Sequence, residues 1–176
     1  MVEILLLARK RIIHKAENKI LVFQKIIKNH MLKYGNLKYS FVYAPEGSDK
    51  DGVKMLDRYM NVLEEDYPFV KAFPYTHHSE NKKEVMENFE HGYIDMLFSM
   101  KCLDEGVDIP RAELAVFCSS TGNPRQFIQR RGRVLRKHPD KNIALIHDLV
   151  VIPRKDDEQE TFSIEKNLMK GELTRV

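Results

Sequence analysis

The sequence predicts an α/β fold in which helices pack on both faces of a mostly parallel central sheet. Short apolar or β-rich runs alternate along the chain with segments of helical periodicity, and this alternation is typical of βαβ units. Several runs are too continuously apolar for a surface hairpin, which favours strands buried inside a parallel sheet. A length of 176 residues with 43% hydrophobic content suits one such domain.

The first part of the chain is expected to be a helical lead-in followed by a strand. Residues 2–34 contain no proline or glycine, and apolar side chains recur there at helical spacing, at Ile13, Ile20, Phe23 and Ile27. Gly35 and Asn36 are stop signals. The β-rich run Tyr39–Ala44 then predicts the first strand.

The middle of the chain continues the alternation. A helix ending before Pro68 is expected from the apolar residues Met55, Leu56, Tyr59 and Leu63. Val70–Tyr75 predicts a short strand, and Asn81 with Glu84 resembles a capping box that begins the next helix. Gly92 is expected to end that helix.

The second half holds three more apolar runs, which predict strands buried on both faces: Ile94–Phe98, Leu114–Cys118 and Ile143–Ile146. Before the last of them, Asn123 and Pro124 form an N-cap and first-turn pair, so a helix should begin there and run through Arg136. Residues 162–176 are expected to form a final helix.

Composition restricts the class of protein. A formal charge of +3 with 31% charged residues describes a mildly basic surface, which permits a phosphate-rich partner without requiring one. Cys102 and Cys118 have no CxxC spacing, and the pair His77-His78 has no evident third ligand, so we predict neither a disulfide nor a metal site. The longest apolar run is too short to span a bilayer, and we expect a cytoplasmic protein without membrane contact.

The loop after the strand ending near Phe98 contains the acidic segment 104–110, DEGVDIP. Gly106 permits close approach of the backbone to a ligand, and Asp108 can accept hydrogen bonds from a ribose hydroxyl. From this loop alone, an ordinary acidic surface turn is the favoured interpretation, because short glycine-acid motifs are common by chance.

The helix expected from Pro124 carries the clearer signal. At 100° per residue, one stripe holds Gln126, Gln129, Arg133 and Arg136, and the opposite stripe holds Phe127, Ile128, Val134 and Leu135. Five arginines between Arg125 and Arg136 without interleaved glutamates favour anion binding over a solvated basic face. Arg131 falls on the apolar side, where it is expected to snorkel or pair with a neighbouring loop. Gly132 suggests that another group comes close to the helix there.

Segment 105–110, EGVDIP, resembles helicase motif V, and segment 129–136, QRRGRVLR, resembles helicase motif VI, the QxxGRxxR signature. The match covers roughly Tyr39 to Leu149 and looks most like repair helicases of the xeroderma pigmentosum group B type and restriction-enzyme motor subunits. The resemblance implies a three-layer RecA-like domain, the second of two in superfamily 2 helicases. We then expect residues 1–36 to lead in from an upstream motor domain, residues 37–150 to form the helicase C-terminal domain, and residues 151–176 to form an extension.

The resemblance also implies roles for single residues. Arg133 and Arg136 would be the catalytic arginine fingers that contact the γ-phosphate of ATP bound with Mg²⁺. Asp108 and Gly106 would contact the nucleotide, Gln129 would link it to the domain interface, and Arg130 would pair with acids across the cleft. Met100 replaces the usual motif V threonine that contacts a nucleic-acid phosphate, so Lys101, with Thr76 and His77, is expected to contact nucleic acid.

The sequence contains no GxxxxGK[ST] loop and no DExH box. We therefore expect the chain by itself neither to hydrolyse ATP nor to unwind nucleic acid, and to be an excised piece whose partner is the N-terminal RecA-like domain of the same parent. An alternative is a non-catalytic RecA-like module that binds nucleic acid or has a regulatory role. DNA is the expected track, but the sequence leaves open DNA against RNA and repair against restriction.

Overall fold

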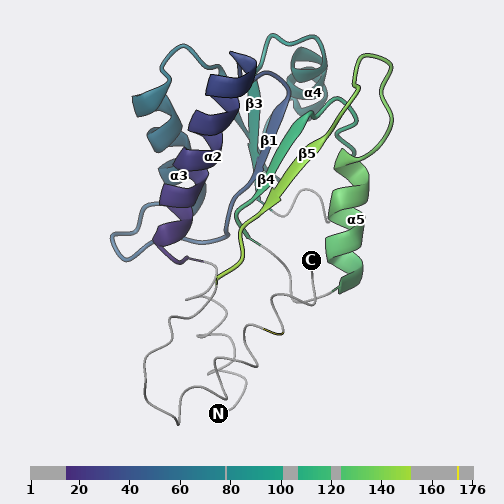
Figure 1. The fold of residues 1–176 in the computed structure, drawn as a ribbon. Helices are drawn as coiled ribbons and strands as arrows, with labels where there is room; N and C mark the ends of the chain where they lie inside the picture. Colours follow the sequence, from purple (N-terminus) through teal and green to yellow (C-terminus); the bar gives the residue numbers. More distant parts are fainter. Residues whose placement is uncertain (1–14, 78, 101–106, 120–123, 152–169, 171–176) are drawn as a thin grey trace.

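The structure is a computed structural model, and it describes residues 15–77, 79–100, 107–119, 124–151 and 170. Its centre is a five-stranded sheet in the order β2-β3-β1-β4-β5, with every neighbouring pair of strands parallel (Figure 1). The strands are β1 (Ser40–Tyr43), β2 (Ala72–Tyr75), β3 (Met96–Ser99), β4 (Leu114–Phe117) and β5 (Leu145–Asp148). The predicted parallel α/β fold is confirmed.

The helices form a layer on each face of the sheet. One layer contains α2 (Asn18–Tyr34) and α3 (Met55–Asp66), and the other contains α4 (Lys82–Glu90) and α5 (Pro124–Val134) (Figure 1). Alternate residues of one strand enter different halves of the core: Val42 packs in the half that includes α2 and α3, whereas Phe41 and Tyr43 pack in the half that includes Phe89 of α4 and Val134 of α5. The fold is therefore a three-layer domain.

The central and edge strands differ in burial. All residues of β1, β3 and β4 are buried, as expected for largely apolar strands inside a parallel sheet. The edge strands β2 and β5 are only partly buried. The predicted last strand is present, but the bounds expected for it, Ile143–Ile146, and its expected burial on both faces are wrong. The strand begins two residues later, and Ile143 is 58% exposed.

Helix α2 packs against the sheet. Its residues Ile20, Phe23 and Ile27 are buried in the same core cluster as strand residues such as Val42 and Phe98. The ring of Phe23 also lies edge-to-face with that of Tyr59 on α3, with 5.2 Å between centroids. Helix α2 therefore shares the core of the sheet.

The predicted end of α2 at Gly35 is confirmed, whereas the capping box predicted at the start of α4 is wrong. Gly35 ends α2 in the left-handed conformation with φ of 73°, and its N–H donates to Met31 O at 2.8 Å. Asn81 does stand at the N-cap of α4, but it has φ of 51° and makes no side-chain capping bond. The predicted capping box with Glu84 is absent, because this left-handed backbone does not present the Asn81 side chain as a cap.

Two sequence predictions concern segments outside this description. The final helix expected over residues 162–176 lies outside the described residues except for Lys170, and so does Asn123. Among the described helices, none combines the length and the apolar character needed to cross a bilayer.

Candidate nucleotide site beside α5

The carboxyl end of α5 meets the loop that precedes β4. Ile109 N donates to Arg133 O at 3.4 Å, and Arg133 Nη1 donates in return to Val107 O at 3.3 Å. Arg136 Nη1 forms an ion pair with Asp108 Oδ2 at 2.5 Å. The structure thus brings Asp108 and both predicted arginine fingers together, although 25 and 28 positions separate them in the sequence.

The ion pair between Arg136 and Asp108 remains accessible. The Arg136 side chain is 60% exposed and that of Asp108 is 33% exposed. The second carboxylate oxygen, Asp108 Oδ1, is buried and has no hydrogen-bond partner among the described residues. A buried acceptor without a donor is costly unless a ligand supplies one, so this oxygen fits the ribose hydroxyl that the resemblance implies.

The orientation of α5 differs from the predicted one. The helix ends at Val134, so Arg136 lies beyond it, and Arg133 and Arg136 do not share one helix as predicted. Ile128 and Leu135 are 68% and 54% exposed, while Arg130 and Val134 are buried. The predicted apolar stripe is therefore wrong for Ile128 and Leu135.

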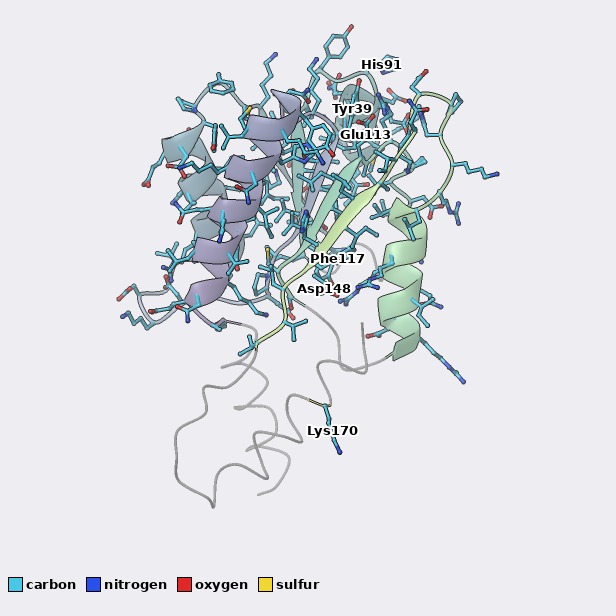
Figure 2. All side chains as sticks on the ribbon, in the orientation of Figure 1. Tyr39, His91, Glu113, Phe117, Asp148 and Lys170 are labelled. Atoms are coloured by element: carbon cyan, nitrogen blue, oxygen red, sulfur yellow. The ribbon has the colours of Figure 1, made fainter. Side chains whose placement is uncertain are left out.

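Two arginines on the inner face of α5 contact the carboxyl ends of strands. Arg130 is 8% exposed, and its guanidinium lies 4.4 Å from the ring centroid of Tyr43 at the end of β1. Arg131 Nη2 pairs with Asp148 Oδ2 at 3.4 Å, as expected for an arginine that finds a neighbouring partner. Figure 2 shows Asp148 beside Phe117, the last residues of β5 and β4, near α5. Within this domain, Arg130 packs on Tyr43, and its pairing with acidic residues across the cleft stays a prediction.

The outer face of α5 is open. Gln129 and Gly132 are exposed, and a methyl group added at Gly132 would meet nothing within 4 Å among the described residues. The close neighbour expected at Gly132 is therefore not provided by the described part of this chain. Gly106, the predicted site of backbone approach, lies outside the described residues.

The predicted nucleic-acid contacts lie beyond two adjacent strands. Tyr75 of β2 is in register with Ser99 of β3, so the two strands end side by side, just before Thr76 and Met100. Thr76 N donates to Ser79 Oγ at 2.8 Å, and the two hydroxyl oxygens are 3.3 Å apart, which holds the Thr76 hydroxyl in a local turn. His77 is exposed, and Lys101 lies outside the described residues.

Sequence reasoning missed a cluster at the amino ends of the strands, where Figure 2 shows Tyr39 and Glu113. Arg111 is 7% exposed, lies 3.5 Å from the ring centroid of Tyr39 and forms an ion pair with Glu113. Its Nη1 also donates to Asp140 O at 3.2 Å. Glu113 is only two residues from Arg111, but Tyr39 and Asp140 are far from it in the sequence, so no local spacing predicts the whole cluster. It anchors the loop that carries Asp108.

The one described cysteine has no sign of catalytic activation. Cys118 follows β4, is free and fully buried, and burial raises the pKa of its thiol to about 12, against the opposing charge of Lys19. The thiol therefore stays protonated at neutral pH. Within the described ranges, no three His, Cys, Asp or Glu side chains are grouped closely enough to hold a metal ion.

The all-parallel sheet, with Arg133 of α5 and Arg136 just beyond it beside the Asp108 loop, defines a RecA-like domain of the helicase type. The chain belongs to the family described as "Helicase conserved C-terminal domain", whose model matches residues 5–138. The segment expected from sequence, Tyr39 to Leu149, overlaps most of that match.

Relatives and solved structures agree with this assignment. The DNA 3'-5' translocase XPB2 of Sulfurisphaera tokodaii is 39% identical over 77 residues, which are 44% of this chain and 17% of that protein. The putative DNA 3'-5' helicase Rad25 of Haloarcula marismortui is 29% identical over 116 residues, 65% of this chain and 18% of that protein. The chain thus spans less than a fifth of these relatives.

Two solved structures share the fold. The Pyrococcus furiosus Hef helicase domain matches 82% of this chain and 28% of its own, with a TM-score of 0.51 and 24% identity. Domain 2 of the Mss116p DEAD-box helicase, bound to an RNA duplex, matches 90% of this chain and 67% of its own, with a TM-score of 0.58 and 13% identity. At these identities the likeness shows the RecA-like fold alone.

Proposed function

We propose that this chain is the second motor domain of an ATP-dependent DNA helicase or translocase, with Arg133 and Arg136 as its arginine fingers. The observation that carries the proposal is that both guanidinium groups meet the Asp108 loop while Arg136 stays 60% exposed. Arginines placed in this way stabilise the negative charge that develops on a transferred phosphoryl group.

The Arg136–Asp108 pair suits an exchange of partners. Ion pairs between exposed side chains contribute only about 0–1 kcal/mol, so little free energy opposes their separation. The phosphates of ATP with Mg²⁺, the proposed substrate, carry more negative charge than one carboxylate and compete for Arg136. Asp108 Oδ1 then accepts from the ribose, and Gly106 and Gln129 are the other proposed nucleotide contacts.

The proposed partner is the N-terminal RecA-like domain of the same parent protein, docked on the outer face of α5. This face combines polar Gln129 with the exposed apolar side chains of Ile128 and Leu135. The open space around Gly132 supports a close approach of that domain. Arg130, held over Tyr43, would fix the helix in position beneath it.

The proposed nucleic-acid track crosses the carboxyl ends of β2 and β3, with Thr76, His77 and Lys101 as contacts. The register of Tyr75 with Ser99 supports this arrangement because it places the ends of β2 and β3 side by side. DNA is the proposed track because two relatives carry DNA in their names, the XPB2 translocase and the Rad25 helicase.

The test uses the full-length parent protein and measures ATP hydrolysis with duplex DNA, single-stranded DNA and RNA. We expect DNA to stimulate hydrolysis, and Arg133→Ala and Arg136→Ala to lower kcat by about 10³-fold or more, the usual contribution of an arginine finger. Arg125→Ala is the matched control, because Arg125 is an exposed arginine near the start of the same helix, and its activity should stay within about twofold.

Three results would contradict the proposal. One is magnesium-dependent ATPase activity of the 176-residue chain alone, and another is equal, negligible stimulation by all three nucleic acids. The third is an active parent in which both arginine variants behave like the Arg125 control. DNA binding by a parent without ATPase activity would instead support a non-catalytic binding module.

A further inference from the structure

A lysine from the loop after α5 occupies the last carbonyl of that helix. Lys141 Nζ donates to Val134 O at 2.8 Å, and Val134 is the final residue of α5. In a helix that continued, the same carbonyl would accept the N–H of His138, four residues on. Lys141 therefore takes the acceptor that one more helical turn would need.

Two further backbone hydrogen bonds lie at this end of α5, one from the residue after the helix and one from the Asp108 loop. Leu135 N donates to Arg131 O at 2.9 Å, which is the last helical bond, and Ile109 N donates to Arg133 O from the Asp108 loop. A cation is favoured at this end because the helix dipole is negative there. Burial, with a smaller effect of the nearby Arg111 charge, lowers the pKa of Lys141, as expected for an amine withdrawn from water.

The turn that holds Lys141 is tied to the Asp108 loop. Lys141 N donates to His138 O at 3.1 Å and closes the turn. Asp140 O accepts from Arg111, which belongs to the same loop as Asp108. The turn that carries Lys141 is thus joined by a hydrogen bond to the loop that carries Asp108.

We propose that Lys141 is a positioning residue for Arg136, an inference that rests on the proposed function. By ending α5 at Val134, Lys141 lets the chain bend at Leu135, so that Arg136 leaves the helix path and reaches Asp108. Without this contact, α5 would extend toward His138, where it would stop because a residue before proline disfavours helical backbone. Arg136 would then lie on the helix surface and lose its contact with Asp108.

The first test measures backbone hydrogen exchange in the 176-residue protein. In Lys141→Met, the His138 N–H gains Val134 O as its acceptor, so we expect its exchange to slow by about tenfold or more. Lys141→Arg keeps a side-chain donor for Val134 O and should leave the exchange rate of the His138 N–H unchanged. Lys137→Met is the matched control, because Lys137 is an exposed lysine of the same segment. Unchanged or faster exchange at His138 in Lys141→Met would overturn the proposal, whereas general destabilisation cannot produce local slowing.

The second test measures DNA-stimulated ATP hydrolysis by the full-length parent. Lys141→Met should lower kcat by about tenfold and change KM less, because the misplaced group acts on the reacting phosphate. Lys141→Arg should restore activity to within about twofold of wild type. In an Arg136→Ala background, Lys141→Met should have almost no further effect, because its influence passes through Arg136. An equal tenfold loss in that background would overturn the proposal.

The two tests distinguish a failure of the proposed function from a failure of the inference on Lys141. A wild-type parent without ATPase activity would overturn the proposed function and with it the part of Lys141 in the reaction, while His138 exchange would still report how α5 ends. An active parent that is sensitive to Arg136→Ala but indifferent to Lys141→Met would overturn the inference on Lys141 alone.

Discussion

Replacement of Phe23 by alanine tests whether α2 is part of the domain core. Phe23 is 1% exposed, and its ring lies edge-to-face with those of Tyr59 at 5.2 Å and Phe98 at 6.2 Å between centroids. Loss of a buried phenyl ring costs about 3–5 kcal/mol, a range that already includes the lost edge-to-face contacts. We therefore expect the free energy of unfolding to fall by about 4 kcal/mol, a large share of the about 5–15 kcal/mol typical of a domain.

The assay is urea unfolding of the 176-residue protein, followed by circular dichroism and compared at equal m-value. Leu21→Ala is the control, because Leu21 lies on the same helix but is 64% exposed, and its change should stay within about 0.5 kcal/mol. If Phe23→Ala costs less than about 1 kcal/mol, or no more than Leu21→Ala, α2 would be a lead-in segment and the packing argument would be refuted.

Gly132→Ala should stabilise the 176-residue protein by about 0.5–1 kcal/mol in urea titration, because alanine favours the helix and the added methyl meets nothing within 4 Å. The same variant should lower the parent's ATPase activity if another domain packs there, and unchanged activity would count against that docking face. Gly92→Ala should have the opposite effect on stability, a loss of about 1–3 kcal/mol, because Gly92 has φ of 72° and the methyl would lie 2.8 Å from the Tyr39 hydroxyl. Stability should also fall at acid pH. Burial lowers the pKa of both His30 and His147, so the unfolded chain takes up protons first as the pH falls through about 6.5, and stability declines until the folded-state pKa values are passed. Urea midpoints between about pH 7.5 and 5.5 measure this slope, which the double variant His30→Gln with His147→Gln should reduce; an equal slope in that variant would contradict the assignment.

The order of helices and strands and the parallel sheet could be predicted because they depend on local hydrophobic periodicity. Runs such as Leu114–Phe117 are apolar at every position and are buried at every position. The boundaries of β5 could not be predicted in this way. Ile143 and Ile146 suit a strand equally well, and pairing of Leu145 with Leu114 on β4 decides where the strand begins.

The candidate site, too, could be predicted from the sequence only in part. The sequence by itself singled out the residues that we propose to carry the chemistry, since Asp108, Arg133 and Arg136 belong to short motifs that can be recognised without coordinates. The sequence did not determine which face of α5 packs against the sheet. Arginine is amphipathic, and it can lie on the inner face only where the fold supplies a partner such as Tyr43 or Asp148.

Only the tertiary structure decided where α5 ends and how Arg136 reaches Asp108. The helical pattern continues through Arg136 in the sequence, yet α5 stops at Val134, whose carbonyl is bound by Lys141. Contacts of this kind join residues that come together only when the chain has folded, so local hydrophobic periodicity cannot predict them. The sequence identified the candidate site residues, and tertiary packing set their geometry.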